Sequence, residues 1–212
     1  MLELLNVKKN YGELEVLKGI NLKVNRGDFV AIVGRSGSGK TTMLNLIGGI
    51  DTPDSGSILL NGEDITKFGE NQLALYRRRE VGFIFQSFNL LPNLTVYENI
   101  RIPLLLNKKD QSSIKTVAET IKIADKLHKY PGQLSGGEQQ RVAIARGIVH
   151  NPSILLCDEP TGNLDSHNSE IIINLISEIN QKFGTTVLLI THEKGIADSA
   201  RSKIEIKDGE IL

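Results

Sequence analysis

The sequence predicts an α/β fold, in which a mostly parallel β-sheet is covered by helices on both faces. Short apolar runs typical of buried strands recur along the chain, and amphipathic helical patterns separate several of them. Strands that alternate with helices in this way usually run parallel, because each helix returns the chain to the same end of the sheet. The 212 residues suffice for one large α/β domain, or for a core with a smaller attached lobe.

The first part of the chain is predicted to consist mainly of strands. Leu2–Val7 and Ile20–Val24 alternate apolar and polar residues, as half-buried strands do. Phe29–Val33 is a compact β-branched run that fits a buried strand, and a glycine-rich turn follows it directly. Thr42–Gly48 has the apolar spacing of a helix. Further short strands are predicted over Ser57–Leu60 and Val81–Phe85.

The middle of the chain changes character. Val96–Leu106 and Ser113–His128 show helical spacing with many polar residues, which suggests a helical lobe inserted into the α/β core. Buried-strand runs return at Ser153–Cys157 and Thr186–Ile190. We therefore predict one domain over residues 1–212, with a core formed by 1–86 and 153–212 and a helical subdomain over about 87–152.

Two elements complete the prediction near the end of the chain. Between the last two buried strands, apolar residues recur at the spacing of a helix that packs on the sheet; they are Ile172, Leu175, Ile176 and Ile179. The tail Ile204–Leu212 is predicted to be a hairpin that turns at Asp208 and Gly209.

Composition narrows the functional classes. The chain has 25 basic residues (Lys and Arg) and 25 acidic residues (Asp and Glu), so its formal net charge is zero. A neutral chain has no general attraction to nucleic acid, and we expect no nucleic-acid partner. The one cysteine, Cys157, allows no internal disulfide. No apolar run approaches the roughly 20 residues that span a bilayer, so another chain would supply any membrane-spanning part. We also expect no secretory leader and no C-terminal regulatory domain.

Residues 34–41 read Gly-Arg-Ser-Gly-Ser-Gly-Lys-Thr, which fits the phosphate-loop pattern G-x-x-x-x-G-K-[ST]. Its glycines let the backbone curl so that several N–H groups point at phosphate oxygens, and the following helix adds the positive end of its dipole. Lys40 would bring positive charge to the terminal phosphates, and the Thr41 hydroxyl is well placed to ligate Mg²⁺. The predicted nucleotide contacts are Gly34, Arg35, Ser36, Gly37, Ser38, Gly39, Lys40, Thr41 and Thr42.

An apolar strand, Ile154–Asp158, ends in a carboxylate and is followed by Glu159. In a fold with a phosphate loop, Asp158 would help to hold Mg²⁺. Glu159 would orient or deprotonate the attacking water. Two acids at the solvated end of a strand are common in themselves, but the phosphate loop in the same chain favours the catalytic interpretation.

Residues 134–141 read Leu-Ser-Gly-Gly-Glu-Gln-Gln-Arg and precede a helical run over Val142–Val149. The Ser135 hydroxyl and the amides of Gly136 and Gly137 are predicted to lie at a helix N-terminus, where they would form an anion site. The chain contains a phosphate loop, followed by this motif and then by a strand that ends in Asp-Glu. This order of motifs resembles that of the ATP-binding cassette (ABC) family. The resemblance extends over about residues 2–212.

The resemblance implies roles for further residues. Tyr11 stands where the family has an aromatic residue that stacks on adenine, and Gln86 where it has a glutamine that senses Mg²⁺ and the attacking water. His192 matches the family's switch histidine, and Gly162–Asp165 matches a loop that crosses between subunits. The implied catalytic residues are Glu159, His192 and Gln86, the implied metal ligands are Thr41, Gln86 and Asp158, and Ser135, Gly136, Gly137 and Glu138 would contact nucleotide.

The resemblance therefore implies a P-loop NTPase of ABC type, with antiparallel N-terminal strands beside the mostly parallel sheet and with ATP and Mg²⁺ as its ligands. Two copies would meet head to tail and enclose two ATP molecules, each between one phosphate loop and the Ser-Gly-Gly of the partner. A separate transmembrane permease would be the second kind of partner. It would hold the chain at the cytoplasmic side of the cell membrane.

The sequence of residues 133–146 and 159–165 looks like that of the group concerned with lipoprotein release, macrolide export and antimicrobial-peptide resistance. The preferred function is thus the ATPase subunit of an export or release system. A cell-division-type ABC ATPase, a soluble ABC ATPase that acts on DNA or the ribosome, and a binding module with little turnover are the alternatives. No coiled-coil heptads separate Lys40 from Ser135, which disfavours a DNA-repair ATPase, and the presence of Glu159 and His192 disfavours loss of catalysis.

Two other segments allow more than one interpretation. Arg77–Arg79 is predicted to be the solvated end of a helix rather than a contact for acidic groups. The segment Ser87–Asn99 carries apolar residues that look exposed, namely Phe88, Leu90, Leu91 and Leu94. They either pack within the helical lobe or, as the resemblance implies, receive a short helix of the membrane subunit.

Overall fold

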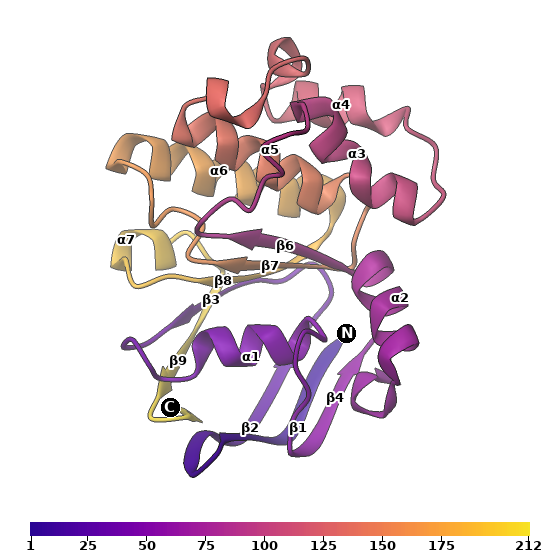
Figure 1. The fold of residues 1–212 in the computed structure, drawn as a ribbon. Coiled ribbons are helices and arrows are strands. Elements are labelled where there is room, and N and C mark those ends of the chain that lie inside the picture. Colours follow the sequence, from indigo (N-terminus) through magenta and orange to yellow (C-terminus); the bar gives the residue numbers. More distant parts are fainter.

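The computed structural model describes residues 1–212, apart from the side chain of Lys194. The described residues form two sheets, which lie on either side of α1 in Figure 1. The larger sheet has the strand order β10-β9-β3-β8-β7-β6, and its neighbours from β9 to β6 are parallel. The smaller sheet has the order β2-β1-β4-β5 and is antiparallel. The predicted α/β class, with antiparallel strands beside a mostly parallel sheet, is confirmed.

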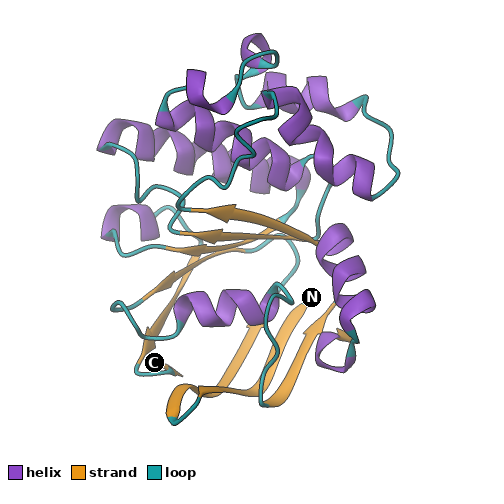
Figure 2. Ribbon diagram, in the orientation of Figure 1, coloured by secondary structure: helices purple, strands orange, loops and turns teal.

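Figure 2 distinguishes the strands from the helices, which lie beside and between the two sheets. The strands are β1 (Leu2–Tyr11), β2 (Leu14–Val24), β3 (Phe29–Val33), β4 (Ser55–Leu60), β5 (Glu63–Asp64), β6 (Val81–Phe85), β7 (Ile154–Asp158), β8 (Thr186–Ile190), β9 (Ser202–Lys207) and β10 (Glu210–Ile211). The α-helices are α1 (Lys40–Ile47), α2 (Glu70–Glu80), α3 (Val96–Leu106), α4 (Ser113–Thr120), α5 (Gly136–Ile148), α6 (Ser166–Phe183) and α7 (Lys194–Ala197). Short 3-10 turns occupy Ile65–Lys67, Ala124–Lys126 and Pro131–Gln133.

The central parallel strands bury side chains on both faces, which explains their unbroken apolar sequences. In β7, Ile154 and Leu156 pack in one core, and Leu155 and Cys157 pack in the other. The first core also contains residues of α1, β1, β2 and β4, whereas the second contains residues of α3, α4, α5 and α6. The parallel sheet is therefore a wall between two cores, and the loops at its edges remain accessible.

The helical spacing of Ser113–His128 does not correspond to one continuous helix, because α4 ends at Thr120 and a 3-10 turn follows at Ala124–Lys126. Lys122 between them has a left-handed backbone with φ of 59°. Both Ile121 and Ile123 are fully buried in the same core. Successive residues of an α-helix turn by about 100°, so an unbroken helix would point two residues that are two positions apart in nearly opposite directions. The break lets both isoleucines reach the core.

The N-terminal strands are longer than their alternating patterns predict. β1 extends to Tyr11 and β2 begins at Leu14, so Gly12 and Glu13 form a tight hairpin turn. The register shifts between Leu4 and Val7, and this irregularity interrupts the alternation that a sequence pattern can detect. Because of the extension, Tyr11 lies at the tip of the hairpin.

The helical segments between β6 and β7 lie over one face of the parallel sheet (Figure 1). The boundaries of a separate helical subdomain stay a prediction. Within the described part of the chain, Val142 and Ala145 of α5 share one core with Leu155 of β7, so apolar packing is continuous between these helices and the sheet.

Two further expectations concern the surface. Arg77 and Arg78 are half-buried, and Arg77 donates a hydrogen bond to the Gly49 carbonyl at 2.6 Å, so only Arg79 fits the expected solvated helix end. In the described part of the chain, no helix combines the length and the apolar character needed to cross a lipid bilayer.

Candidate nucleotide site

The loops that carry the predicted site residues leave the parallel sheet at one edge. Gly34 follows β3, Gln86 follows β6, Glu159 follows β7 and His192 lies two residues after β8. Because β3, β8, β7 and β6 are parallel neighbours in that order, their carboxyl ends lie at the same edge. In open α/β sheets, this edge is where ligands bind.

The phosphate loop connects β3 with α1. Lys40, the first residue of α1, is buried at 7% exposure, and its Nζ donates hydrogen bonds to the carbonyls of Gly34 at 2.9 Å and Arg35 at 2.8 Å. The backbone has φ of 79° at Gly37 and 98° at Gly39, the left-handed region that favours glycine. The buried Ser38 Oγ has no hydrogen-bond partner among the described residues. The loop thus presents a lysine ammonium, backbone amides and a hydroxyl in one place.

A cavity of about 320 Å³ joins this loop to two predicted residues from other elements. Tyr11 at the tip of the β1–β2 hairpin lines it, as does Glu159. The complete lining is Tyr11, Leu14, Val16, Ser36, Gly37, Gly39, Lys40, Thr41, Thr42 and Glu159. Gly34, Arg35 and Ser38 belong to the same loop but lie outside that lining. An aromatic ring and a phosphate loop on one cavity suit a nucleotide, which has a flat base and an anionic tail.

Asp158 and Thr41 form a pair of oxygen donors beside the loop. The Thr41 hydroxyl donates a hydrogen bond to Asp158 Oδ1 at 3.2 Å. Burial raises the pKa of Asp158, and the charge of Glu159 acts in the same direction, whereas the bond from Thr41 opposes them. A cation at this place would remove the penalty on the ionised carboxylate. The pair therefore fits Mg²⁺, which binds to oxygen ligands.

Glu159 has a left-handed backbone with φ of 46°, which is uncommon for a residue other than glycine. Its amide donates to the Ile190 carbonyl at 3.2 Å, so the ends of β7 and β8 hold it in place. Glu159 Oε1 lies 3.4 Å from His192 Nδ1, whose side chain is exposed. Strain of this kind is found at functional sites, where the surrounding structure fixes a side chain in its working position.

Gln86 is exposed and contacts the loop that follows Glu159. The Asn163 side-chain amide donates to the Gln86 carbonyl at 2.9 Å. A methyl group on Gly162 would lie 2.6 Å from Gln86 Nε2, so the two segments pack closely. Asp165 ends this loop and caps α6, because its carboxylate accepts a hydrogen bond from the Asn168 amide at 2.8 Å.

Ser135 caps α5, as its sequence predicts. Its Oγ accepts from the Glu138 amide at 3.3 Å, and Glu138 Oε2 accepts from the Ser135 amide at 2.8 Å, which together form a capping box. None of Ser135, Gly136, Gly137 and Glu138 lines the cavity that holds the phosphate loop. The backbone hydrogen bond from Ser135 lowers the pKa of Glu138. A carboxylate that is ionised and engaged in capping has no free donor for phosphate, so contact of Glu138 with nucleotide stays a prediction.

Several residues that connect these segments cannot be recognised from the sequence. The fully buried Gln140 donates to the Pro160 carbonyl at 2.6 Å and so joins α5 to the loop beside Glu159. Arg146 donates to the carbonyls of Asn89 at 2.7 Å and Phe88 at 3.0 Å. Gln140 and Arg146 stand in the quoted motif and in the helical run after it. Their partners are distant in sequence, so no spacing could identify them.

A family profile described as "ABC transporter" matches residues 17–162. A macrolide export ATP-binding/permease protein of Bdellovibrio bacteriovorus is 43% identical over 217 residues; the match covers all of this chain and 33% of the relative. A bacitracin export ATP-binding protein of Halalkalibacterium halodurans is 42% identical over 219 residues, with all of this chain and 87% of the relative covered. The chain thus spans about a third of the macrolide export protein's length.

Among solved structures, the ATP-binding cassette MJ0796 superimposes with a TM-score of 0.90 at 38% identity, over all of this chain and 96% of the other. That structure is described as a dimer in a post-hydrolysis state bound to ADP and phosphate. The fold and the site define a P-loop nucleotide-hydrolysing cassette. More specifically, the chain belongs to the ABC transporter family and is an ATPase domain of that family.

Proposed function

We propose that this chain is the ATP-hydrolysing subunit of an export or release system, and that ATP closes two copies of it head to tail. The observation that carries the proposal is the meeting of the phosphate loop, Glu159, His192 and Gln86 at one edge of the parallel sheet. Export is favoured over import because two relatives that match the whole chain are described as export proteins.

ATP would bind with its base on Tyr11 and its phosphates in the loop from Gly34 to Thr42, because Tyr11 and most residues of this loop line one cavity. Lys40 would exchange its bonds to loop carbonyls for bonds to phosphate oxygens. Thr41, Asp158 and Gln86 would hold Mg²⁺. When bound, this ion would neutralise part of the phosphate charge.

The site of one copy would be completed by the other. Ser135, Gly136 and Gly137 lie at the start of a helix of 13 residues and outside the cavity of their own chain. Ser135 is exposed, Gly136 is half-buried and Gly137 is buried. A helix N-terminus attracts anions, so this group suits the γ-phosphate of an ATP held by a second copy. A dimeric, ADP- and phosphate-bound relative supports this arrangement. Loss of the γ-phosphate on hydrolysis would weaken the contact and reopen the pair.

Hydrolysis requires a water aligned with the γ-phosphate and a group that accepts its proton. The Glu159 carboxylate would take the proton as the water oxygen bonds to phosphorus, and the bond from phosphorus to the ADP oxygen would break. His192 is 3.4 Å from Glu159 Oε1 and would hold that carboxylate in position. Its exposed ring could also contact the phosphate.

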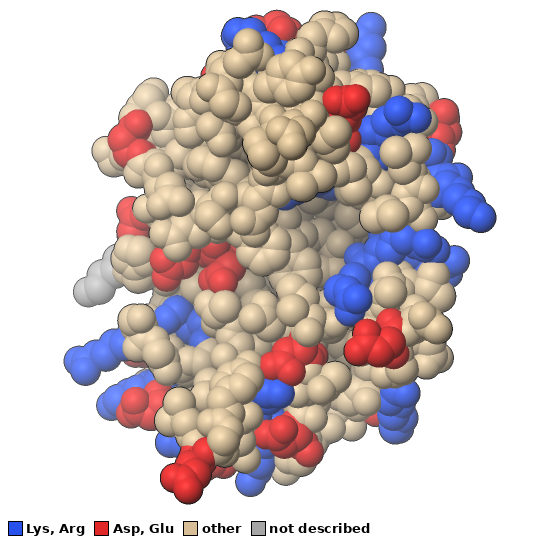
Figure 3. All heavy atoms as spheres, viewed as in Figure 1, with Lys and Arg blue, Asp and Glu red and all other residues tan. Residues whose placement is uncertain are grey.

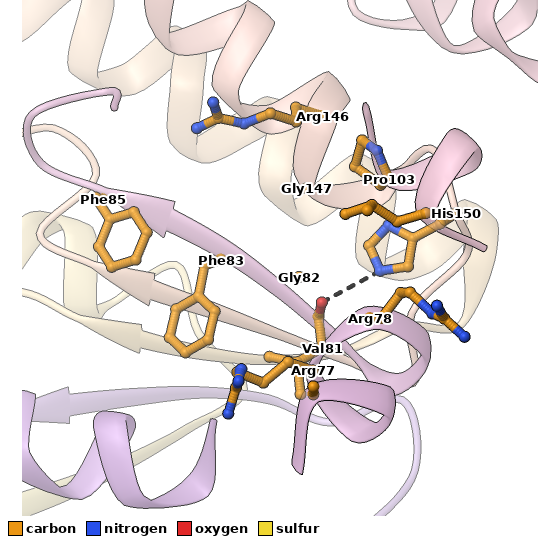
Figure 4. A pocket seen from close by; sticks show the side chains of 12 residues that line it. Arg77, Arg78, Val81, Gly82, Phe83, Phe85, Pro103, Arg146, Gly147 and His150 are labelled. Carbon is orange, nitrogen blue, oxygen red and sulfur yellow. Dashed lines mark hydrogen bonds between the residues drawn. The ribbon is translucent and has the colours of Figure 1, made fainter. Parts of the chain in front are cut away.

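A second cavity supports a permease partner. It has a volume of about 400 Å³ and lies between α2, β6, α3 and α5. The stacked rings of Phe83 and Phe85 line it, together with Arg77, Arg78 and Arg146 (Figure 4). Figure 3 shows basic side chains beside a hollow in this part of the surface. An apolar floor with a basic rim suits a short amphipathic segment that carries carboxylates.

Leu91, Leu105 and Leu106 add exposed apolar surface on the segments near this cavity. Four apolar residues of Ser87–Asn99 were expected to be exposed, namely Phe88, Leu90, Leu91 and Leu94. In the structure only Leu91 is exposed, and Leu90 packs against the core. Packing within the helical lobe therefore holds for Leu90, and the exposure of Leu91 supports the proposed contact with a permease. A permease docked here would place the chain at the cytoplasmic side of the cell membrane.

The decisive experiment replaces Glu159 by glutamine, which keeps the size of the side chain and removes its basicity. We expect ATP binding to change little and hydrolysis to fall by about a hundredfold or more. Size-exclusion chromatography with ATP should then reveal a lasting dimer. The control Glu170→Gln changes an exposed acid of α6 and should behave as the parent. Unchanged hydrolysis in Glu159→Gln would contradict the proposed mechanism.

A further inference from the structure

The tip of the β1–β2 hairpin contains a hydrogen-bonded group that the proposed function does not explain. The Tyr11 hydroxyl donates to Asp51 Oδ2 at 2.7 Å, and Lys9 Nζ donates to Asp51 Oδ1 at 2.8 Å. The Thr52 amide donates to the same Oδ1 at 2.7 Å, and the Thr52 carbonyl accepts from Lys9 Nζ at 2.8 Å. One carboxylate therefore joins a phenol to an ammonium.

Lys9 and Tyr11 lie two positions apart on β1, with a register shift between Lys9 and Asn10, and their side chains meet at the same Asp51 carboxylate. Lys9 Nζ lies over the Tyr11 ring, 5.1 Å from its centroid. The lysine is buried at 8% exposure, whereas Tyr11 is 50% exposed. One face of the ring is therefore covered by the cation, and Tyr11 also belongs to the lining of the cavity that Lys40 and Thr42 line.

Asp51 comes from a different element, and that element reaches the phosphate loop. Helix α1 begins at Lys40 and ends at Ile47, and the Asp51 amide donates back to the Asn45 carbonyl at 3.3 Å. Asp51 thus ties the hairpin tip to the helix whose first residue belongs to the phosphate loop. This side chain is therefore one of the contacts that set the position of the aromatic ring relative to the phosphate site.

We propose that Lys9 and Asp51 are positioning residues for the nucleoside: they hold the Tyr11 ring so that its free face is a rigid platform for the base. The proposal rests on the proposed function, in which Tyr11 stacks on that base. A tyrosine at a hairpin tip can rotate about two side-chain bonds, and a base that stacks on it must restrict this rotation. A ring already held by its hydroxyl and covered on its other face has less freedom to lose.

Burial disfavours the charge of Asp51, but the hydrogen bonds from Lys9, Tyr11 and Thr52 leave its pKa below the usual value. The carboxylate is therefore ionised at neutral pH. An ionised acceptor binds a phenol hydroxyl more strongly than a neutral one does, which suits a group whose task is to hold a ring still.

The test separates the base from the phosphates. Dissociation constants for MgATP and for magnesium tripolyphosphate are measured by calorimetry on the full chain and on Lys9→Met, Asp51→Ala, Tyr11→Phe and Tyr11→Ala. Base stacking on an aromatic ring is worth about 1 to 3 kcal/mol, so Tyr11→Ala should weaken ATP binding by about tenfold or more. Lys9→Met and Asp51→Ala should weaken it by about threefold to tenfold, and Tyr11→Phe by about threefold. Tripolyphosphate binding should change less than about twofold throughout, because its site is intact.

A matched control removes an ion pair from the same strand far from the tip. Glu3 lies 2.7 Å from Lys23 across β1 and β2, so Glu3→Gln should bind both ligands as the parent does. Steady-state kinetics gives a second readout: Lys9→Met and Asp51→Ala should raise KM for ATP and leave kcat unchanged. Tyr11→Phe removes a single hydroxyl, so it tests the proposal even if Asp51→Ala fails to fold.

The outcomes are distinguishable. If Tyr11→Ala weakens ATP binding selectively but Lys9→Met, Asp51→Ala and Tyr11→Phe do not, the positioning role is wrong and the base platform of the proposed function stands. Equal losses for ATP and tripolyphosphate in Asp51→Ala would also overturn the inference, since the role would then be structural. If even Tyr11→Ala leaves ATP binding unchanged, Tyr11 does not stack on the base, and that part of the proposed function fails.

Discussion

Two glycines of the phosphate loop provide a sharp test of why the loop has its sequence. Gly37 and Gly39 both have a left-handed backbone, with φ of 79° and 98°. An added methyl group at Gly37 would meet nothing within 4 Å. The same group at Gly39 would lie 2.7 Å from Leu17 Cδ2 and 2.9 Å from the Val16 carbonyl oxygen. Alanine at Gly39 therefore has a steric cost that alanine at Gly37 does not have.

The magnitudes follow from these contacts. A left-handed backbone costs a residue with a side chain about 1 to 2 kcal/mol, and the reduced freedom of the unfolded chain returns about 0.5 kcal/mol or more. We expect Gly37→Ala to lower the free energy of unfolding by about 1 kcal/mol. Gly39→Ala must also displace β2 from the loop, and overpacking of this kind costs about 1 to 3 kcal/mol more. For a chain of this size, the difference corresponds to a melting temperature about 2 to 12 °C lower.

The assay is urea unfolding of the nucleotide-free protein, followed by circular dichroism. Gly12→Ala is the matched control, because Gly12 has φ of 61° and nothing within 4 Å but lies outside the phosphate loop. It should resemble Gly37→Ala. Equal unfolding midpoints for Gly37→Ala and Gly39→Ala would refute the argument that close approach of β2 selects glycine at position 39.

Two further predictions concern stability and assembly. Burial lowers the pKa of His150, which is 4% exposed, to about 4, so between pH 6.5 and 4 the unfolded chain binds a proton that the folded chain does not. The free energy of unfolding should fall by about 3 kcal/mol as the pH falls through that window. Urea unfolding at pH 7 and 4.5 should show a smaller fall for His150→Leu than for the parent chain. An equal fall in both proteins would assign the acid sensitivity to other groups. Ser135→Arg should leave ATP binding to the single chain within about twofold and lower hydrolysis by about tenfold or more, because the anion site offered to the second copy is blocked. Loss of ATP binding by the dilute single chain would contradict the shared site.

The strands and the phosphate loop were predictable because local chemistry decides them. Runs such as Phe29–Val33 are apolar since both faces of the strand are buried, and a glycine-rich loop with a lysine has few uses other than binding phosphate. The break in the helix near Lys122 was not predictable, because it depends on where Ile121 and Ile123 must point in a core made by distant elements. Helical spacing alone cannot distinguish one bent segment from one straight helix.

The connections within the site were also invisible in the sequence. Tyr11 and Asp51 are far apart along the chain, and only the fold shows that they share a hydrogen bond. Gln140 stands in a quoted motif, yet its bond to the Pro160 carbonyl depends on how α5 packs beside the end of β7. Residues that take part in the chemistry can be recognised in the sequence from their residue types and their order along the chain. Residues that hold them in place can be recognised only from the contacts that they make in the folded structure.

Helix α5 has one consequence beyond packing. It starts next to Ser135, which caps it, and Arg146 near its far end holds the carbonyls of Phe88 and Asn89. Thirteen residues of α-helix form a stiff rod of about 20 Å. If a neighbouring molecule displaced Ser135, α5 would therefore move as a rigid body and transmit the displacement to the segment that follows Gln86. Helix α5 therefore connects the surface that we propose contacts a second copy with the surface beside the cavity lined by Arg77, Arg78 and Arg146.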